Sequence, residues 1–150
     1  MILAIDVGNT NIVVALFDGA ELKNSWRIST DKNKTSDEIG ITLCQLTEHS
    51  GIDNSQIEDV IISSVVPPLT GIIKRALSAI ADCRIIEVNI NMNHPLKIVT
   101  DNPNQIGNDL LVAAVAAMEN YTLPLVIFDL GTATTLTVLD KNGILRGVSI

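Results

Sequence analysis

The stretch MILAIDVGNTNIVVALF, Met1 to Phe17, decides the fold of this chain. Met1 to Ile5 is a short apolar run, and Ile12 to Phe17 is another. Between them Asp6 to Asn11 is a cluster of turn-forming residues. Short apolar runs bounded by turn formers are typical of strands. The stretch therefore predicts a strand, a tight turn and a second strand.

The residues after this hairpin predict the rest of an α/β domain. Asp18 and Gly19 suit a hairpin turn, which leads into a third strand over Leu22 to Ser29. β-branched residues at Val60 to Ile62 suit a buried parallel strand. The other elements expected in order are a helix from Ser36 to Gly51, a break at Pro67-Pro68, a helix from Leu69 to Ala81, a strand from Arg84 to Val88, a polar connection from Asn89 to Asn104 and a helix from Ile106 to Asn120.

One pattern occurs twice along the chain. A strand, an Asp-x-Gly turn followed by Thr and a returning strand span Ile2 to Phe17 and again Leu125 to Leu139. Such repetition predicts a duplicated domain. We expect a first domain over residues 1–120 and the beginning of a second over residues 121–150. Because the chain stops at Ile150 with no helix left to cover the new sheet, we expect the second domain to be truncated.

Composition narrows the class of protein. A chain of 150 residues with 47% hydrophobic content can bury one core. Its formal charge of −7 repels phosphate backbones and anionic lipids, so neither nucleic acid nor a membrane is an expected partner. The longest apolar stretch, Leu110 to Met118, is too short to span a bilayer, and the start of the chain lacks a basic leader. These features predict a cytoplasmic protein.

The two cysteines do not indicate a metal cluster or a disulfide. Cys44 and Cys83 lie far apart, and neither has a Cys or His neighbour at zinc-like spacing. We expect both to be buried thiols.

The first Asp-Gly turn has the chemistry of a phosphate loop. Gly8 lets the backbone turn tightly and lets N–H groups approach a phosphate. The side chains of Asn9, Thr10 and Asn11 can donate to phosphate oxygens, while the Asp6 carboxylate can hold a hydrated Mg²⁺. The alternative is that Gly and Asn serve hairpin geometry alone. The chain has no Walker loop and no Rossmann glycine fingerprint that would bind a nucleotide by another route.

The second turn, Asp129-Leu130-Gly131-Thr132-Ala133-Thr134-Thr135, adds three Thr hydroxyls after its glycine. Two such turns at equivalent points of a repeated pattern favour phosphate binding over geometry alone.

Asp109 is the candidate general base. Phosphoryl transfer needs a carboxylate that can accept the proton of the acceptor hydroxyl. Asp109 follows Asn102-Pro103 and Gly107 near the start of an Ala-rich helix, where free N–H groups are available to a substrate. An ordinary carboxylate in the first turn of a helix would give the same pattern, and spacing alone does not separate the two readings.

Taken together, these residues resemble the type III pantothenate kinases. The matching motifs run in family order over the whole chain. They are Asp6-Val7-Gly8-Asn9-Thr10, Trp26-Arg27-Ile28-Ser29-Thr30, Thr35-Ser36-Asp37-Glu38, Ser63-Ser64-Val65-Val66-Pro67, the stretch from Asn102-Pro103 to Asp109, and Asp129 to Thr135. The resemblance implies a ribonuclease H-like fold of the actin-like ATPase type, with a mixed five-stranded sheet, in which two loops clamp the ATP phosphates.

The resemblance also implies a function and a set of site residues. The reaction would be ATP-dependent phosphorylation of pantothenate to 4'-phosphopantothenate, the first step toward coenzyme A, catalysed by a homodimer. Asp109 would be the general base, and Asp129 would hold a monovalent cation, K⁺ or NH₄⁺, beside the Mg²⁺ held through water by Asp6. ATP would be bound by Asp6, Val7, Gly8, Asn9, Thr10, Asn11, Ile12, Val13 and Thr132. Pantothenate would be bound by Thr100, Gly107, Asn108, Asp109 and Leu110.

Three positions depart from the family pattern. Leu110 stands where the family usually has Arg, Thr100 where many members have an aromatic residue, and Thr137 where Asp is common. Leu cannot replace the bidentate contact of a guanidinium. Two alternatives therefore remain on the same fold: a nucleotide-binding regulator, and a kinase of another small hydroxylated acceptor.

Overall fold

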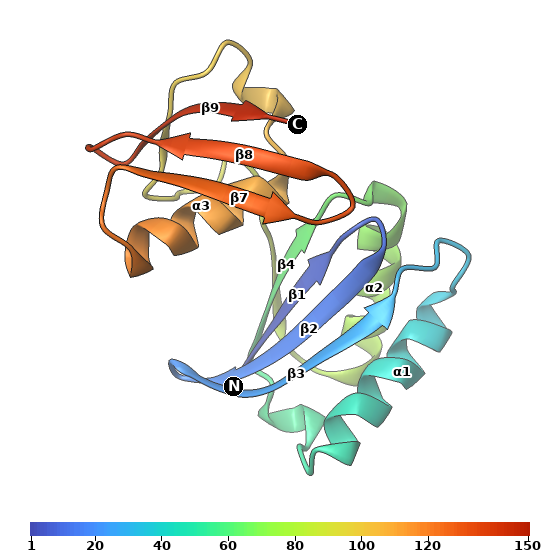
Figure 1. Cartoon of the computed structure of the whole chain (residues 1–150). Helices are drawn as coiled ribbons and strands as arrows, with labels where there is room; N and C mark the ends of the chain where they lie inside the picture. Colours follow the sequence, from blue (N-terminus) through green and yellow to red (C-terminus); the bar gives the residue numbers. More distant parts are fainter. The chain divides into compact units, whose positions relative to one another are not determined.

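The computed structural model describes residues 1–150, which form two compact units, Met1–Val88 and Asn89–Ile150 (Figure 1). The elements of the first unit are β1 (Ile2–Val7), β2 (Asn11–Asp18), β3 (Glu21–Ser29), α1 (Ser36–His49), a 3₁₀ turn η1 (Asn54–Gln56), β4 (Asp59–Ser64), α2 (Pro67–Ile80) and β5 (Arg84–Glu87).

The first unit is built on a five-stranded mixed sheet in the order β3-β2-β1-β4-β5. β1 pairs antiparallel with β2 and parallel with β4, while β3 extends the meander and β5 pairs parallel with β4. This confirms the mixed five-stranded sheet expected from the sequence. β1 is the central strand of the sheet. The turn that follows it therefore lies midway along the row of strand ends, and not beside an outer strand.

Alternation along β1 separates a core face from an open face. Leu3, Ile5 and Val7 are buried, whereas Asp6 on the opposite face is exposed. α1 and α2 pack against each other and cover the core face (Figure 1). The other large side chains that are fully buried in this core are Val14, Leu16, Val60, Ile62, Val66, Leu69, Ile73 and Leu77.

Helix α1 begins after a capping box formed by Thr35 and Glu38 and is followed by a glycine. The Thr35 side chain accepts a hydrogen bond from the Glu38 backbone N–H, and the Glu38 carboxylate accepts from the Thr35 backbone N–H in return. These bonds from Thr35 lower the pKa of Glu38. Gly51, with φ of 71°, follows the helix and ends it as expected.

The expected break at Pro67-Pro68 is wrong. The two prolines are the first two residues of α2, which begins at Pro67 rather than Leu69. The first turn of a helix has N–H groups without intrahelical partners, so proline costs nothing there and its fixed φ favours the helix.

The second unit contains a four-stranded sheet in the order β6-β9-β8-β7. Its elements are β6 (Lys97–Ile98), a 3₁₀ turn η2 (Pro103–Gln105), α3 (Asn108–Asn120), β7 (Leu125–Leu130), β8 (Thr134–Leu139) and β9 (Ile144–Ser149). β7, β8 and β9 form an antiparallel meander, as β1, β2 and β3 do in the first unit. β6 was not predicted, because two residues carry no periodicity that could reveal a strand.

α3 belongs to the second compact unit. It packs against β7 and β8, and it starts at Asn108, two residues later than expected. Thr137 and Leu139 are buried on the covered side of the sheet, whereas Val126, Phe128 and Leu130 of β7 are exposed on the other side. The compact units divide at Val88, while the domain division at residue 120, which rests on the repeated pattern, stays a prediction.

Both cysteines are free, as expected, but the expectation that they are buried holds only in part, because each side chain is partly exposed. Burial, with Asp82 and Asp59 nearby, raises the pKa of Cys83.

No helix of this chain combines the length and apolar content needed to cross a bilayer.

Ile62 is the position at which the core is most simply tested. Its side chain has no exposed surface on the inner strand β4, so we expect Ile62→Ala to lower the free energy of unfolding by about 2 to 5 kcal/mol, measured by chemical denaturation. Ile41→Ala on α1 is the matched control, because Ile41 is 60% exposed and its loss should cost within about 0.5 kcal/mol. Equal losses for the two variants would contradict the assigned core.

Candidate functional site

The turn between β1 and β2 is held at both ends by hydrogen bonds. The Gly8 backbone N–H donates to the Asn11 carbonyl at 3.0 Å. Thr30, the residue after β3, donates its hydroxyl to the Gly8 carbonyl at 2.7 Å and its backbone N–H to the Thr10 carbonyl at 2.9 Å. At the exposed tip, the Asn9 N–H donates to no backbone carbonyl. The loop is thus ordered with a peptide donor open to an anion.

Gly8 is required by close approach inside this turn. A Cβ added there would lie 3.0 Å from the carbonyl oxygen of Asn11, which is backbone and cannot move aside cheaply. Glycine lets the two backbone segments approach each other.

Asp6 has a neighbour on the adjoining strand that sequence reasoning missed. β1 and β4 pair in parallel, and Asp6 is the register partner of Ser63. The Ser63 hydroxyl is buried without a hydrogen-bond partner, and the residue is 6% exposed. Two polar side chains, one exposed and one buried, thus share the face of the sheet opposite α1 and α2 where its parallel strands end, the usual place for ligands in α/β sheets.

The start of α2 is not itself an anion site. It follows β4, but its first two residues are Pro67 and Pro68, which have no N–H to donate. The next N–H, that of Leu69, donates to the Val66 carbonyl. The first three residues of α2 therefore offer no free peptide N–H to an anion.

The second Asp-Gly turn repeats the form of the first. Asp129 is the second-last residue of β7, as Asp6 is of β1, and three residues join the strands in both hairpins. Its carboxylate lies over the turn, because a Cβ built on Gly131 would be 3.6 Å from Asp129 Oδ1. Its register partner is Thr135, whose hydroxyl is also buried without a partner. Both turns thus combine an exposed aspartate with an unpaired hydroxyl.

The residues predicted to bind the acceptor lie in the second unit. Gly107 is the N-cap of α3, Asn108 and Asp109 are its first two residues, and the Leu110 N–H donates to Asp109 Oδ1 at 2.8 Å. The Leu110 side chain is buried. Thr100 is half-buried, and its hydroxyl has no partner. The helix start thus holds a partly exposed carboxylate, but the side chain at position 110 belongs to the core.

Some of the residues predicted to bind ATP could contact it only through their backbone atoms. Val7 and Ile12 are buried in the core of the first unit, and Val13 is half-buried. Thr132 lies exposed in the second turn, where its hydroxyl can reach a ligand. Thr30 and Ser63 were missed, although both stand in motifs of the family pattern. Only strand pairing brings them to the Asp6 turn, so no local signal could have assigned them a role.

The residues around Asp6 fit a hydrated Mg²⁺. No group of three or more His, Cys, Asp or Glu side chains could enclose a metal ion in this chain. Mg²⁺ does not require one, because it keeps several waters and binds through one or two carboxylates plus phosphate oxygens. The exposed Asp6 carboxylate and the orphaned Ser63 hydroxyl are the groups that such an ion would use.

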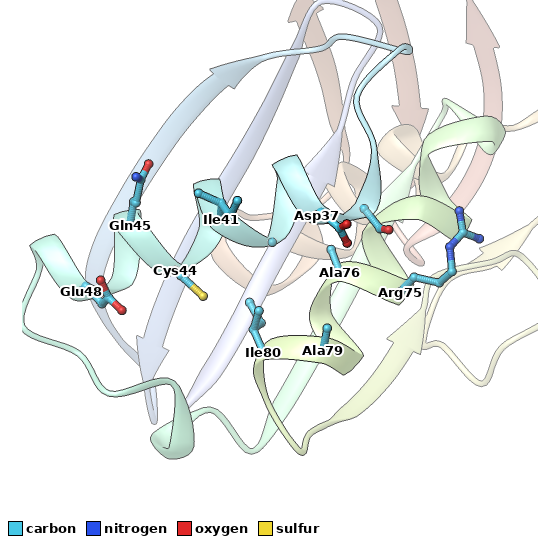
Figure 2. Close-up of a pocket in the computed structure, with 11 residues that line it drawn as sticks. Asp37, Ile41, Cys44, Gln45, Glu48, Arg75, Ala76, Ala79 and Ile80 are labelled. Carbon is cyan, nitrogen blue, oxygen red and sulfur yellow. The ribbon is translucent and has the colours of Figure 1, made fainter.

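A groove elsewhere in the first unit contains none of the predicted site residues. It lies between α1 and α2, measures about 420 Å³ and has Gly40, Ala76 and Ala79 among its lining. Figure 2 shows Arg75 at one end and Glu48 at the other. The charged side chains Arg75 and Glu48 therefore lie at opposite ends of the groove. A catalytic site would need its charged groups to converge on one point.

Comparison with known proteins identifies the family. The family model of the type III pantothenate kinases matches residues 2–150. The chain belongs to the type III pantothenate kinase family. Among its relatives are the type III pantothenate kinases of Geobacter sulfurreducens, 46% identical over 143 residues, and of Listeria monocytogenes, 39% identical over 150 residues. These matches cover 95% and 100% of this chain, but only 56% and 58% of the relatives. The chain thus spans a little over half the length of these pantothenate kinases.

Solved structures show that this family member has the actin-like ATPase fold. A protein from Sinorhizobium meliloti described as a candidate 2-dehydro-3-deoxygalactonokinase matches 99% of this chain and 52% of its own, with a TM-score of 0.59 and 13% identity. A candidate N-acetylglucosamine kinase from Porphyromonas gingivalis matches 99% of this chain and 46% of its own, with a TM-score of 0.53 and 16% identity. The expected ribonuclease H-like fold is confirmed.

Gly8→Ala tests the steric argument for the first turn. Because the new methyl group would meet the Asn11 carbonyl, we expect this variant to lose about 1 to 3 kcal/mol of unfolding free energy, measured by chemical denaturation. Gly71→Ala in α2 is the control. Its Cβ would meet only the end of the Arg75 side chain, at 3.8 Å, so it should be neutral or stabilising. A Gly8→Ala variant as stable as the Gly71→Ala variant would show that the turn has room for a side chain.

Proposed function

We propose that the protein of which this chain is part phosphorylates pantothenate with ATP, forming 4'-phosphopantothenate in the first step of coenzyme A synthesis. The observation that carries the proposal is the match of the family model to residues 2–150, which include both Asp-Gly turns and Asp109. Kinases of this family use ATP as the phosphoryl donor.

The β1–β2 turn would bind the ATP phosphates. Its support is the ordered loop with the open Asn9 N–H, together with the exposed side chains of Asn9 and Thr10. Local donors of this kind matter in a chain with a formal charge of −7, because the overall field repels a nucleotide. Mg²⁺, held through water by Asp6, would offset charge on the phosphates.

The second turn would contribute Thr132 to the nucleotide and Asp129 to a monovalent cation, K⁺ or NH₄⁺. The likeness of its hairpin to that of β1 and β2 supports a related role. Asp129 is exposed, so its carboxylate is accessible to a cation.

Asp109 would act as general base toward the acceptor hydroxyl. One of its oxygens, Oδ1, accepts the hydrogen bond from the Leu110 N–H, which fixes the carboxylate and leaves Oδ2 to accept the proton. Gly107 and Asn108, at the open start of α3, and Thr100, with its unpaired hydroxyl, would line the acceptor pocket.

The burial of Leu110 favours a second candidate function. This side chain, 7% exposed, offers no cation to a carboxylate substrate where the family usually has Arg. A small hydroxylated acceptor with less negative charge than pantothenate would suit such a pocket. For either acceptor we propose that the protein forms a homodimer and acts in the cytoplasm, because the chain resembles the family.

The acceptor is tested by following ADP release from ATP in the complete protein with Mg²⁺ and K⁺ present. We expect release to depend on pantothenate. Release that requires a different hydroxylated compound would support the second candidate. Nucleotide binding without release, whatever the acceptor, would indicate a regulator and contradict both kinase functions.

Asp109→Asn tests the general base. The amide keeps the size of the side chain but cannot accept the proton, so we expect turnover to fall by about 100-fold or more. ATP binding, measured by calorimetry, should stay unchanged because the phosphates are assigned to the two turns. Asp101→Asn, an exposed carboxylate in the preceding connection, is the control and should keep full turnover. Near-normal turnover in the Asp109→Asn protein would remove Asp109 from this role.

A further inference from the structure

The Ser63 hydroxyl is a buried polar group that makes no hydrogen bond within the protein. The residue is 6% exposed, and its Oγ has no hydrogen-bond partner. Its neighbour Ser64, by contrast, accepts bonds from the Val66 N–H at 3.1 Å and from the Thr70 hydroxyl at 2.9 Å, and so holds the start of α2 in place. An unsatisfied buried hydroxyl costs stability, so its presence needs another explanation.

The position of Ser63 supplies that explanation. It is the register partner of Asp6 in the parallel pair β1–β4, so both side chains stand on the same face of the sheet. Neighbouring strands are about 4.8 Å apart, which is the spacing at which one water molecule can touch both side chains. The Gly8 turn follows two residues after Asp6.

We propose that Ser63 is a positioning residue for the Mg²⁺ of the bound nucleotide. The inference rests on the proposed function of the β1–β2 turn as an ATP-phosphate loop. A water on Mg²⁺ directs its lone pair to the metal and has two hydrogens to donate. The Asp6 carboxylate accepts one of them, and Ser63 Oγ accepts the other. A hydroxyl orients this water without adding a second negative charge beside the phosphates.

Calorimetric titration of the complete protein with a non-hydrolysable ATP analogue, at a series of Mg²⁺ concentrations and in EDTA, tests the inference. For Ser63→Ala we expect the Mg²⁺ concentration needed for half-maximal binding to rise about five- to tenfold. Metal-free binding of the analogue should be unchanged. Thermal unfolding of the free protein should occur at the same or a higher temperature, because the variant removes an unsatisfied group.

Two further variants complete the design. Ser25→Ala, an exposed serine on β3 of the same sheet, should behave as the wild type. Ser63→Cys keeps the size of the side chain with a weaker acceptor, so it should shift the Mg²⁺ dependence in the same direction even if Ser63→Ala folds poorly. In an Asp6→Asn background the effect of Ser63→Ala should shrink, because both residues act on one water.

The outcomes separate this inference from the proposed function. A wild-type protein that does not bind the Mg²⁺-loaded analogue would overturn the assignment of the phosphate loop, and this inference with it. If the wild type binds and the Ser63 variants titrate like Ser25→Ala, only the role of Ser63 is overturned. Equal loss of metal-free and metal-loaded binding would also overturn it, since the hydroxyl would then serve the phosphates or the fold.

Discussion

The pairing of β1 between β2 and β4 is the constraint on which the candidate site depends. Leu3, Ile5 and Val7 bury one face of β1, so the alternate position, Asp6, must point to the open face. A slip of one residue would place the carboxylate in the core and three large apolar side chains in solvent. The hydrophobic core therefore sets the direction of the Asp6 carboxylate without touching it.

The same sheet brings residues from other strands to the Asp6 turn. β3 ends beside the β1–β2 turn, where Thr30 donates two hydrogen bonds to it, and β4 places Ser63 next to Asp6. Gly8 lets the turn close without steric conflict. Ser63 comes from β4 and Thr30 directly follows β3, so the surroundings of the turn are a property of the sheet rather than of one sequence motif.

The second unit contains a hairpin of the same form as β1 and β2, but the residues around it differ. In its hairpin Asp129 is paired with Thr135. Asp109 lies in the first turn of α3. Leu110 contributes to the packing of that helix instead of presenting a charged group. The departure from the family pattern at Leu110 therefore lies at the start of α3, while each of the two Asp-Gly turns keeps an exposed aspartate beside an unpaired hydroxyl.

Local patterns in the sequence were sufficient for most of the fold, and they named part of the candidate site. The apolar runs around Asp6 and Asp129 predicted both hairpins, and the helix expected from Ser36 to Gly51 is found as α1, Ser36–His49, because these signals act over a few neighbouring residues. The prolines of α2 were misread, since proline both ends one element and begins the next. The two-residue strand β6 has too few residues to show a period.

Only the tertiary structure decided which distant residues join the turns. The roles considered for Thr30 and Ser63 depend on strand register, and the burial of Leu110 depends on how α3 packs. Register and packing are set by contacts between segments far apart in the chain, which minimise exposed apolar surface over the whole sheet. A local motif contains no information about those contacts, so the sequence by itself could name the two aspartates but not their neighbours.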